Sequence, residues 1–209
     1  MPLPVSGQVG EQQLGVGVTT QPLRQGRLAD VIVSELNGRY YEQCRAGRLF
    51  IAQAIVTAPV VYTTAAGTGG PLIWNGSTTV NIVPLAVSFA LTTAATTAAF
   101  GLGLTGNTGQ PSAPTTTTAI DGVRNLFLGG AAPNASAFRV GTVVNAGNFL
   151  LPFVGIHLGA TSVDTTLPGF VDLGGSMIVP PGSWCSVAAT VTATAAVLTI
   201  GLIWAEVPI

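Results

Sequence analysis

The residues that could take part in catalysis are few and lie far apart along the chain. The 209 residues include one histidine, His157, and the acids after residue 50 are Asp121, Asp164, Asp172 and Glu206. A histidine can activate a serine nucleophile, but the sequence has no Gly-x-Ser-x-Gly elbow to present one. Two carboxylates a few ångströms apart could hydrolyse a glycoside, and nothing in the spacing of these acids favours such a pair. We therefore predict that the protein is not an enzyme.

Residues that could bind a metal ion or a nucleotide are not grouped either. Cys44 and Cys185 are far apart and neither belongs to a Cys-x-x-Cys motif, so their spacing does not indicate a metal site. The phosphate-binding loop Gly-x-x-x-x-Gly-Lys-Ser/Thr is absent as well. We predict no metal and no other cofactor. The two cysteines could form a disulfide, but unpaired cysteine is often buried as a small apolar residue, and we favour that interpretation.

Charged side chains are scarce in this chain. Seven basic and eight acidic residues make up 7% of the sequence, against about 25% in an ordinary soluble domain, and every basic residue is arginine. Eight of these fifteen residues lie between positions 24 and 48. A monomer uses surface charge to stay dissolved and to avoid self-association. The composition therefore predicts a subunit that buries much of its surface in permanent contacts with neighbours.

The same composition argues against nucleic acid and membrane as partners. The net charge is −1 at pH 7, and the five arginines between positions 24 and 48 are mixed with three acids, so no basic patch is predicted. The uncharged stretches Val80–Thr105 and Val187–Ala205 contain much Thr, Ala and Gly, which suits strands better than a membrane-spanning helix. The first thirteen residues lack the basic start and apolar run of a signal peptide. We expect neither partner.

Residues 1–50 are predicted to form an extended arm followed by a β-hairpin. Glycine and proline recur through residues 1–28 and interrupt any regular element, which is typical of an arm that drapes over a neighbour. Asn37-Gly38 lies between two strand-like runs, and this pair is preferred in the type I′ turn of a hairpin. A fully extended arm of about 28 residues spans roughly 80–90 Å. Such an arm is long enough to reach the next subunit.

Residues 51–209 are predicted to form an all-β body. Short β-rich runs alternate with Gly, Pro, Asn and Asp, and turn signals recur roughly every 8–12 residues, which is typical of a sandwich or barrel. In the last run, Leu198, Ile200, Leu202 and Trp204 occupy alternate positions, so we expect them to share one buried face. Thr105–Ala119 is predicted to be an exposed polar loop, the kind of segment that often carries recognition.

Several short motifs follow one another along the chain. They are Gly38-Arg-Tyr-Tyr-Glu42, Arg45-Ala-Gly-Arg-Leu-Phe50, Pro180-Pro-Gly-Ser-Trp184 and Trp204-Ala-Glu-Val-Pro208. Together with the arm before them and the weakly charged β body, they resemble virion structural proteins of tailed bacteriophages, particularly capsid decoration (cement) or head-fibre proteins. The resemblance implies a jelly-roll-like β-sandwich, assembly as a homotrimer on the capsid lattice, and no catalytic residues.

The resulting hypothesis is a structural virion protein, a decoration or cement subunit that stabilises the phage head by subunit–subunit contacts. Its expected partners are other copies of itself and the major capsid protein or another virion protein. Its expected location is the capsid surface, after synthesis in the host cytoplasm. Because arginine pairs well with carboxylates at interfaces, we expect residues 24–50 to supply the contacts. The candidates are Arg24, Arg27, Arg39, Tyr40, Tyr41, Glu42, Arg45, Arg48 and Phe50.

Two other functions stay open from the sequence. A receptor- or glycan-binding module at a fibre tip would use loops near Gly67–Pro71 and Thr105–Thr118. Glycan sites favour an exposed aromatic side chain, and Trp74 is the candidate. A β-sandwich hydrolase would need Asp164 or Asp172 as part of an acid pair. Head, tail and fibre all stay open as positions on the virion.

Overall fold

The computed structural model describes ten segments of the chain. They are residues 6–7, 21–22, 40–57, 61–65, 70–93, 100–120, 123–148, 151–156, 168–191 and 197–209. The chain divides into two compact units, Met1–Tyr41 and Glu42–Ile209. In the first unit, β1 (Ser6–Gly7) pairs antiparallel with β2 (Gln21–Pro22). The rest of the predicted arm and the predicted Asn37-Gly38 turn lie outside the described residues.

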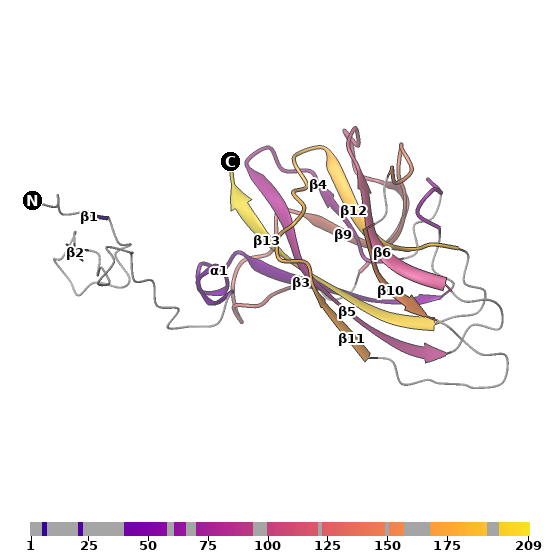
Figure 1. Ribbon diagram of the computed structural model, residues 1–209. Coiled ribbons are helices and arrows are strands. Elements are labelled where there is room, and N and C mark those ends of the chain that lie inside the picture. Colours follow the sequence, from indigo (N-terminus) through magenta and orange to yellow (C-terminus); the bar gives the residue numbers. More distant parts are fainter. Residues whose placement is uncertain are drawn as a thin grey trace, which may run out of the picture. The chain divides into compact units, whose positions relative to one another are not determined.

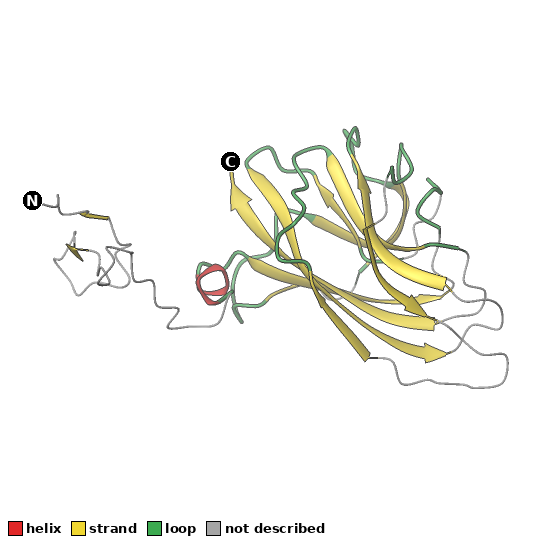
Figure 2. Ribbon diagram, in the orientation of Figure 1, coloured by secondary structure: helices red, strands yellow, loops and turns green. Residues whose placement is uncertain are grey.

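The second unit consists mainly of strands that form two antiparallel sheets, drawn in Figures 1 and 2. The strands are β3 (Leu49–Thr57), β4 (Leu72–Asn75), β5 (Val80–Thr93), β6 (Phe100–Asn107), β7 (Thr115–Ala119), β8 (Arg124–Asn125), β9 (Ser136–Thr142), β10 (Leu151–Ile156), β11 (Pro168–Asp172), β12 (Ser183–Ala189) and β13 (Val197–Pro208). The six-stranded sheet has the order β10-β6-β12-β4-β9-β7, and the five-stranded sheet has the order β11-β5-β13-β3-β8. The predicted all-β body is confirmed.

Strands from opposite ends of the body pair with each other. β3 pairs with β13, β4 with β12, β5 with β11 and β6 with β10. Consecutive strands of this set alternate between the two sheets except β6 and β10, which are neighbours in the six-stranded sheet, and β7, β8 and β9 extend the sheets beside β4 and β3. Because the partners are remote in sequence, the six-stranded sheet is complete only once β12 is in place, and the five-stranded sheet only once β13 is.

The two sheets pack face to face on an apolar core. Leu198, Ile200, Leu202 and Trp204 of β13 are all fully buried, as their alternation predicts. They form one cluster with apolar residues of β3, β5, β6 and β12, so the core includes both sheets. Trp204 stacks on Phe50 of β3 with ring centroids 5.8 Å apart. Burial of each such side chain stabilises the fold by roughly 1.5–3 kcal/mol.

Tyr41–Arg45 form the helix α1, where the sequence predicts the second strand of a hairpin. Gly47 ends the helical turn with a φ of 67°, a left-handed conformation that glycine adopts readily at helix C-termini. The backbone N–H of Arg48 donates to a carbonyl within α1, and the Asn125 side chain donates to the Gly47 carbonyl at 2.8 Å. The strand prediction was wrong because the tertiary contact and the capping glycine outweigh a weak local preference.

The predicted boundary between residues 50 and 51 falls inside β3. Leu49 and Phe50 are 4% and 3% exposed, and they pair with Ala205 and Trp204 of β13. Both residues therefore belong to the body. The division of the chain by contacts places the start of the body at Glu42.

Glu206 is a buried carboxylate near the end of β13 that holds a loop in place. Its Oε2 accepts hydrogen bonds from the backbone N–H and the Nδ2 of Asn134, at 3.0 and 2.7 Å, and its Oε1 accepts one from the N–H of Ala135 at 2.8 Å. Charge-assisted bonds of this kind satisfy a carboxylate that is only 3% exposed. They fix the segment before β9, in one sheet, to β13 in the other.

Two buried amide side chains hold other loops in the same way. Asn75 donates to the carbonyls of Val80 and Val179, both at 2.9 Å, and so ties the turn after β4 to the segment before β12. Gln110 accepts the N–H of Val144 at 2.7 Å. Because each of these buried groups has partners, the loops between the strands are positioned by specific bonds.

We expect Glu206→Gln to lower the free energy of unfolding by about 2 kcal/mol. The amide keeps the volume of the side chain but turns an NH2 group toward backbone N–H donors, so at least one donor loses its acceptor. Urea unfolding followed by tryptophan fluorescence measures the change. Val207→Ala alters the neighbouring, partly exposed side chain and should change stability by less than about 0.5 kcal/mol. Equal effects of the two substitutions would contradict the anchoring role.

Candidate functional site

The acids that could form a hydrolytic pair are not brought together in the described part of the chain. Asp172 lies at the exposed end of β11 and accepts the N–H of Gly174 through Oδ1 at 2.8 Å. Glu206 is buried, and both of its oxygens accept hydrogen bonds from the loop before β9. Asp121 and Asp164 lie outside the described residues. A glycosidase needs two carboxylates that face the same bond, and the described acids do not have this arrangement.

The described residues contain no group of three His, Cys, Asp or Glu side chains that could hold a metal ion, and His157 lies outside them. Cys44 and Cys185 are both unpaired. Cys185 is buried in the core on β12, and this burial raises the pKa of its thiol from 9.0 to about 12. Cys185 therefore stays a neutral thiol and packs as a small apolar residue, as predicted, whereas Cys44 is unpaired but only half-buried.

The predicted interface residues that the structure describes lie mostly in one short segment, residues 40–48, called the α1 segment below. Its exposed members are Tyr41, Glu42, Arg45 and Arg48, and Tyr40 is half-buried. Arg24, Arg27 and Arg39 lie outside the described residues. The α1 segment thus presents one carboxylate, two guanidinium groups and a tyrosine, a mixture that suits contact with another protein.

Phe50 is not available for an interface, so this candidate was wrong. The side chain is 3% exposed and stacks on Trp204 in the core. Residues of a strand point alternately to opposite faces, and β3 turns Phe50, Ala52, Ala54 and Val56 inward. The motif that contains Phe50 therefore combines two exposed arginines with a core aromatic residue.

The outer face of the six-stranded sheet is covered by loops of the same chain. Trp184 and Thr105 do not belong to the main core cluster, yet both are buried. The segments 61–65 and 143–148 lie across this face and are joined by backbone hydrogen bonds. Gly147 lies so close to the Thr105 hydroxyl that a Cβ in its place would clash. The middle strands β6, β12 and β4 are therefore covered on both faces.

Trp74, the candidate for glycan stacking, is part of this covered face. Its indole N–H donates to the Gln110 carbonyl at 2.9 Å, and its ring packs beside the buried cluster of Leu72, Val143 and Trp184. A side chain that is half-buried and already hydrogen-bonded offers a poor platform for a sugar ring. The structure therefore favours a structural role for Trp74.

The polar loop predicted over Thr105–Ala119 is in part strand. β6 continues to Asn107, and β7 pairs antiparallel with β9 at the edge of the six-stranded sheet. Threonine is β-branched and suits a strand, so the threonine run at 115–118 joins the sheet instead of forming a free loop. Of the other predicted recognition loop, Gly70 and Pro71 are described, and both are buried.

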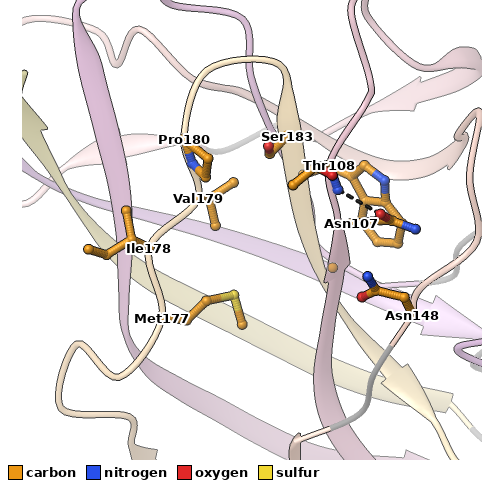
Figure 3. Close-up of a pocket in the computed structure, with 10 residues that line it drawn as sticks. Asn107, Thr108, Asn148, Met177, Ile178, Val179, Pro180 and Ser183 are labelled. Atoms are coloured by element: carbon orange, nitrogen blue, oxygen red, sulfur yellow. Dashed lines mark hydrogen bonds between the residues drawn. The ribbon is translucent and has the colours of Figure 1, made fainter.

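A small hollow opens between the end of β6 and the segment before β12 (Figure 3). Its volume is about 170 Å³, below the roughly 300–1,000 Å³ of ordinary ligand sites. Asn107 and Asn148 lie on one side and Met177 on the other. Asn107 already accepts the N–H of Thr108 at 2.7 Å. All residues that line the hollow are uncharged, so it presents no acid or base for proton transfer.

Comparison of the chain with models of protein families, with curated proteins and with solved structures found no match. None of the helices in the described segments has the length and hydropathy needed to cross a bilayer. The function therefore has to be argued from the strand arrangement and from the chemistry of the surfaces.

We expect one thiol per chain to react with a disulfide reagent such as DTNB in the native protein at pH 8, and two in urea. Cys44 is half-buried on α1, whereas Cys185 is sealed in the core and protonated at this pH. Cys44→Ser should abolish native labelling, and Cys185→Ala should leave it unchanged. Rapid native labelling of Cys44→Ser would contradict the burial of Cys185.

The raised pKa of Cys185 also predicts a pH dependence of stability. Between pH 9 and about 12 the unfolded thiol releases its proton while the folded one keeps it, so the free energy of unfolding falls as the pH rises through this window. Below pH 9 the contribution is fully present. Urea unfolding of the wild type and of Cys185→Ala at pH 8 and pH 10.5 isolates the effect, because the variant should lose less stability between these pH values.

Proposed function

We propose that this chain is a structural protein of a tailed-bacteriophage virion, a capsid decoration (cement) subunit that stabilises the head by subunit–subunit contacts. The order of strand pairing carries the proposal. A jelly roll has eight strands in two sheets, and its first strand pairs with the eighth, the second with the seventh, the third with the sixth and the fourth with the fifth. The pairs β3·β13, β4·β12, β5·β11 and β6·β10 follow this order.

Under this assignment, β7, β8 and β9 form an insertion between the fourth and fifth strands of a jelly roll. Jelly rolls build viral capsid proteins, and they also occur in lectins and cupins. The described residues contain no cluster of ligands for a cupin-like metal site. For a lectin-like site, the Trp74 indole is already hydrogen-bonded, and the hollow in Figure 3 is too small for most ligands. The capsid role is therefore the best supported of the three.

The surface composition supports permanent contact with other virion proteins. Among the side chains that the structure describes from residue 49 onward, the exposed charged ones are Arg124 and Asp172. Large apolar side chains such as Ile55, Phe127 and Phe170 are at least half exposed. Interface cores are depleted in charged residues and enriched in aromatic ones, so this surface suits an assembled subunit.

The α1 segment is the proposed attachment site to the major capsid protein or another virion protein. Tyrosine and arginine are the residues that most often anchor protein interfaces, and Tyr41, Arg45 and Arg48 are exposed there together. The body would associate with two further copies to form a homotrimer on the capsid surface. In this proposal the protein performs no catalysis, because its role is mechanical.

We expect heads that lack this protein to release their DNA at a lower temperature than heads that carry it. Adding the purified full-length protein should restore the wild-type release temperature, because bound subunits add contacts that the heated head must break. Release of DNA is followed with an intercalating dye during heating. Mass spectrometry of purified virions that fails to detect the chain would overturn the proposal.

The double substitution Tyr41→Ala and Arg45→Glu should weaken binding to such heads at least tenfold, since each side chain contributes on the order of 1 kcal/mol or more at an interface. Leu128→Ser is the matched control, because Leu128 is 90% exposed and lies outside the α1 segment. Binding is measured by co-sedimentation of protein with heads. Equal binding by both variants would show that another surface attaches the protein.

A further inference from the structure

The outer face of the five-stranded sheet differs from the covered outer face of the other sheet. Ile55 on β3 is 60% exposed and Phe170 on β11 is 66% exposed, and both point away from the core. We call the outward residues of β11, β5, β13, β3 and β8 the open face. In the middle of this face Ala86 is 1% exposed and Gly201 is buried, so among the described residues the apolar surface that reaches water lies mainly on β3 and β11.

The strand register arranges the open face in rows. The first row is Asp172, Ala86, Ile203, Ile51 and Arg124, from β11 to β8. The second row is Phe170, Ser88, Gly201 and Gln53, and the third is Ala90, Thr199 and Ile55. Directly paired residues point to the same side of a sheet, so each row lies on one face. A Cβ on Gly201 would lie 2.6 Å from Ser88 Oγ and 3.9 Å from Ile51 Cδ1, as neighbours on this face must.

The two halves of the open face are complementary in size. On one side of β13, strand β3 carries the large residues Ile51, Gln53 and Ile55 in rows one to three. On the other side, strand β5 carries Ala86, Ser88 and Ala90 in the same rows. A ridge of large side chains therefore lies beside a shallow strip of small ones. Two copies can therefore pack with the ridge of one against the strip of the other.

The two halves are also complementary in charge. Row one begins with Asp172 at one edge of the sheet and ends with Arg124 at the opposite edge, and both side chains are exposed. The residues between them are apolar. An interface that joins the β8 edge of one copy to the β11 edge of the next places a guanidinium beside a carboxylate, which specifies the pairing and its direction.

We propose that the open face is the surface through which copies of this chain associate, with the β3 side of one copy packed on the β5 side of the next. The number of copies rests on the homotrimer of the proposed function. Four strand spacings of about 4.8 Å give the sheet a width of roughly 19 Å. If three such sheets form the sides of a triangle, the centre of each sheet lies about 5.5 Å from the common axis. This distance is near half of the ~10 Å that separates packed sheets. The outward side chains of three copies therefore fill the centre.

The test is the molar mass of the purified full-length protein, measured by size-exclusion chromatography with light scattering. The wild type should have three times the chain mass of 21.1 kDa. Ile55→Arg and Phe170→Arg each place a charge on the open face and should raise the dissociation constant at least tenfold, so that the chain mass appears at micromolar concentration. Unchanged circular dichroism shows that both variants fold.

Val144→Arg is the matched control. Val144 is 63% exposed, like Ile55 and Phe170, but it lies in the segment that covers the six-stranded sheet. This variant should keep the trimer mass. If Ile55→Arg and Phe170→Arg also keep it, the open face is not the interface, while binding to heads can still support the proposed function. A monomeric wild type overturns this inference and the homotrimer together.

A charge exchange tests the direction of the pairing. Arg124→Asp should weaken association because it faces Asp172 of the next copy, and the double variant Arg124→Asp with Asp172→Arg should recover at least part of it. Asp172 also accepts the N–H of Gly174, so Asp172→Ala serves as the control for the loss of that acceptor. A double variant that associates no better than Arg124→Asp alone overturns the proposed edge-to-edge contact.

Discussion

The antiparallel ladders of the last strand hold the structure together. β13 lies in the middle of the five-stranded sheet, and it pairs with β3 from Val197 to Ala205 and with β5 from Val197 to Pro208. Its inward side chains are fully buried against the other sheet. The pair β5·β11 lies next to β13 in the same sheet, and the pair β4·β12 lies in the opposite sheet. Because first and last strands must meet, the body forms as one cooperative unit.

The outer faces of the two sheets differ in how far other segments of the chain cover them, because their outward residues differ. The six-stranded sheet places Trp184, Trp74 and Leu72 on its outer face, and such large apolar groups need cover, which the segments 61–65 and 143–148 supply. The five-stranded sheet places mostly small residues on the outer face of β5 and β13, with Ile203 as the exception, and larger side chains on β3 and β11. The strip of small side chains on this face can accept large side chains of another sheet at close distance.

The polar groups inside the body hold the fold together instead of forming a reactive site. Glu206 and Asn75 are almost fully buried, and each binds backbone groups of a neighbouring loop. Cys185 is an inert thiol in the core. The exposed groups among the described residues include arginine, tyrosine, the carboxylates of Glu42 and Asp172, and several large apolar side chains.

Local patterns in the sequence are enough to predict an all-β body, the buried face of Leu198–Trp204 and the unpaired core cysteine. These features depend on the two-residue period of a strand and on the apolarity of single residues, both of which are local. Local patterns mispredicted Tyr41–Arg45, which Asn125 helps to hold as a helix, and Phe50, which Trp204 packs in the core. The open face is determined only by the tertiary structure. Its ridge, strip and opposite edge charges exist because β3, β5 and β13 meet in one register, and their residues are too far apart in the chain for any local pattern to show it.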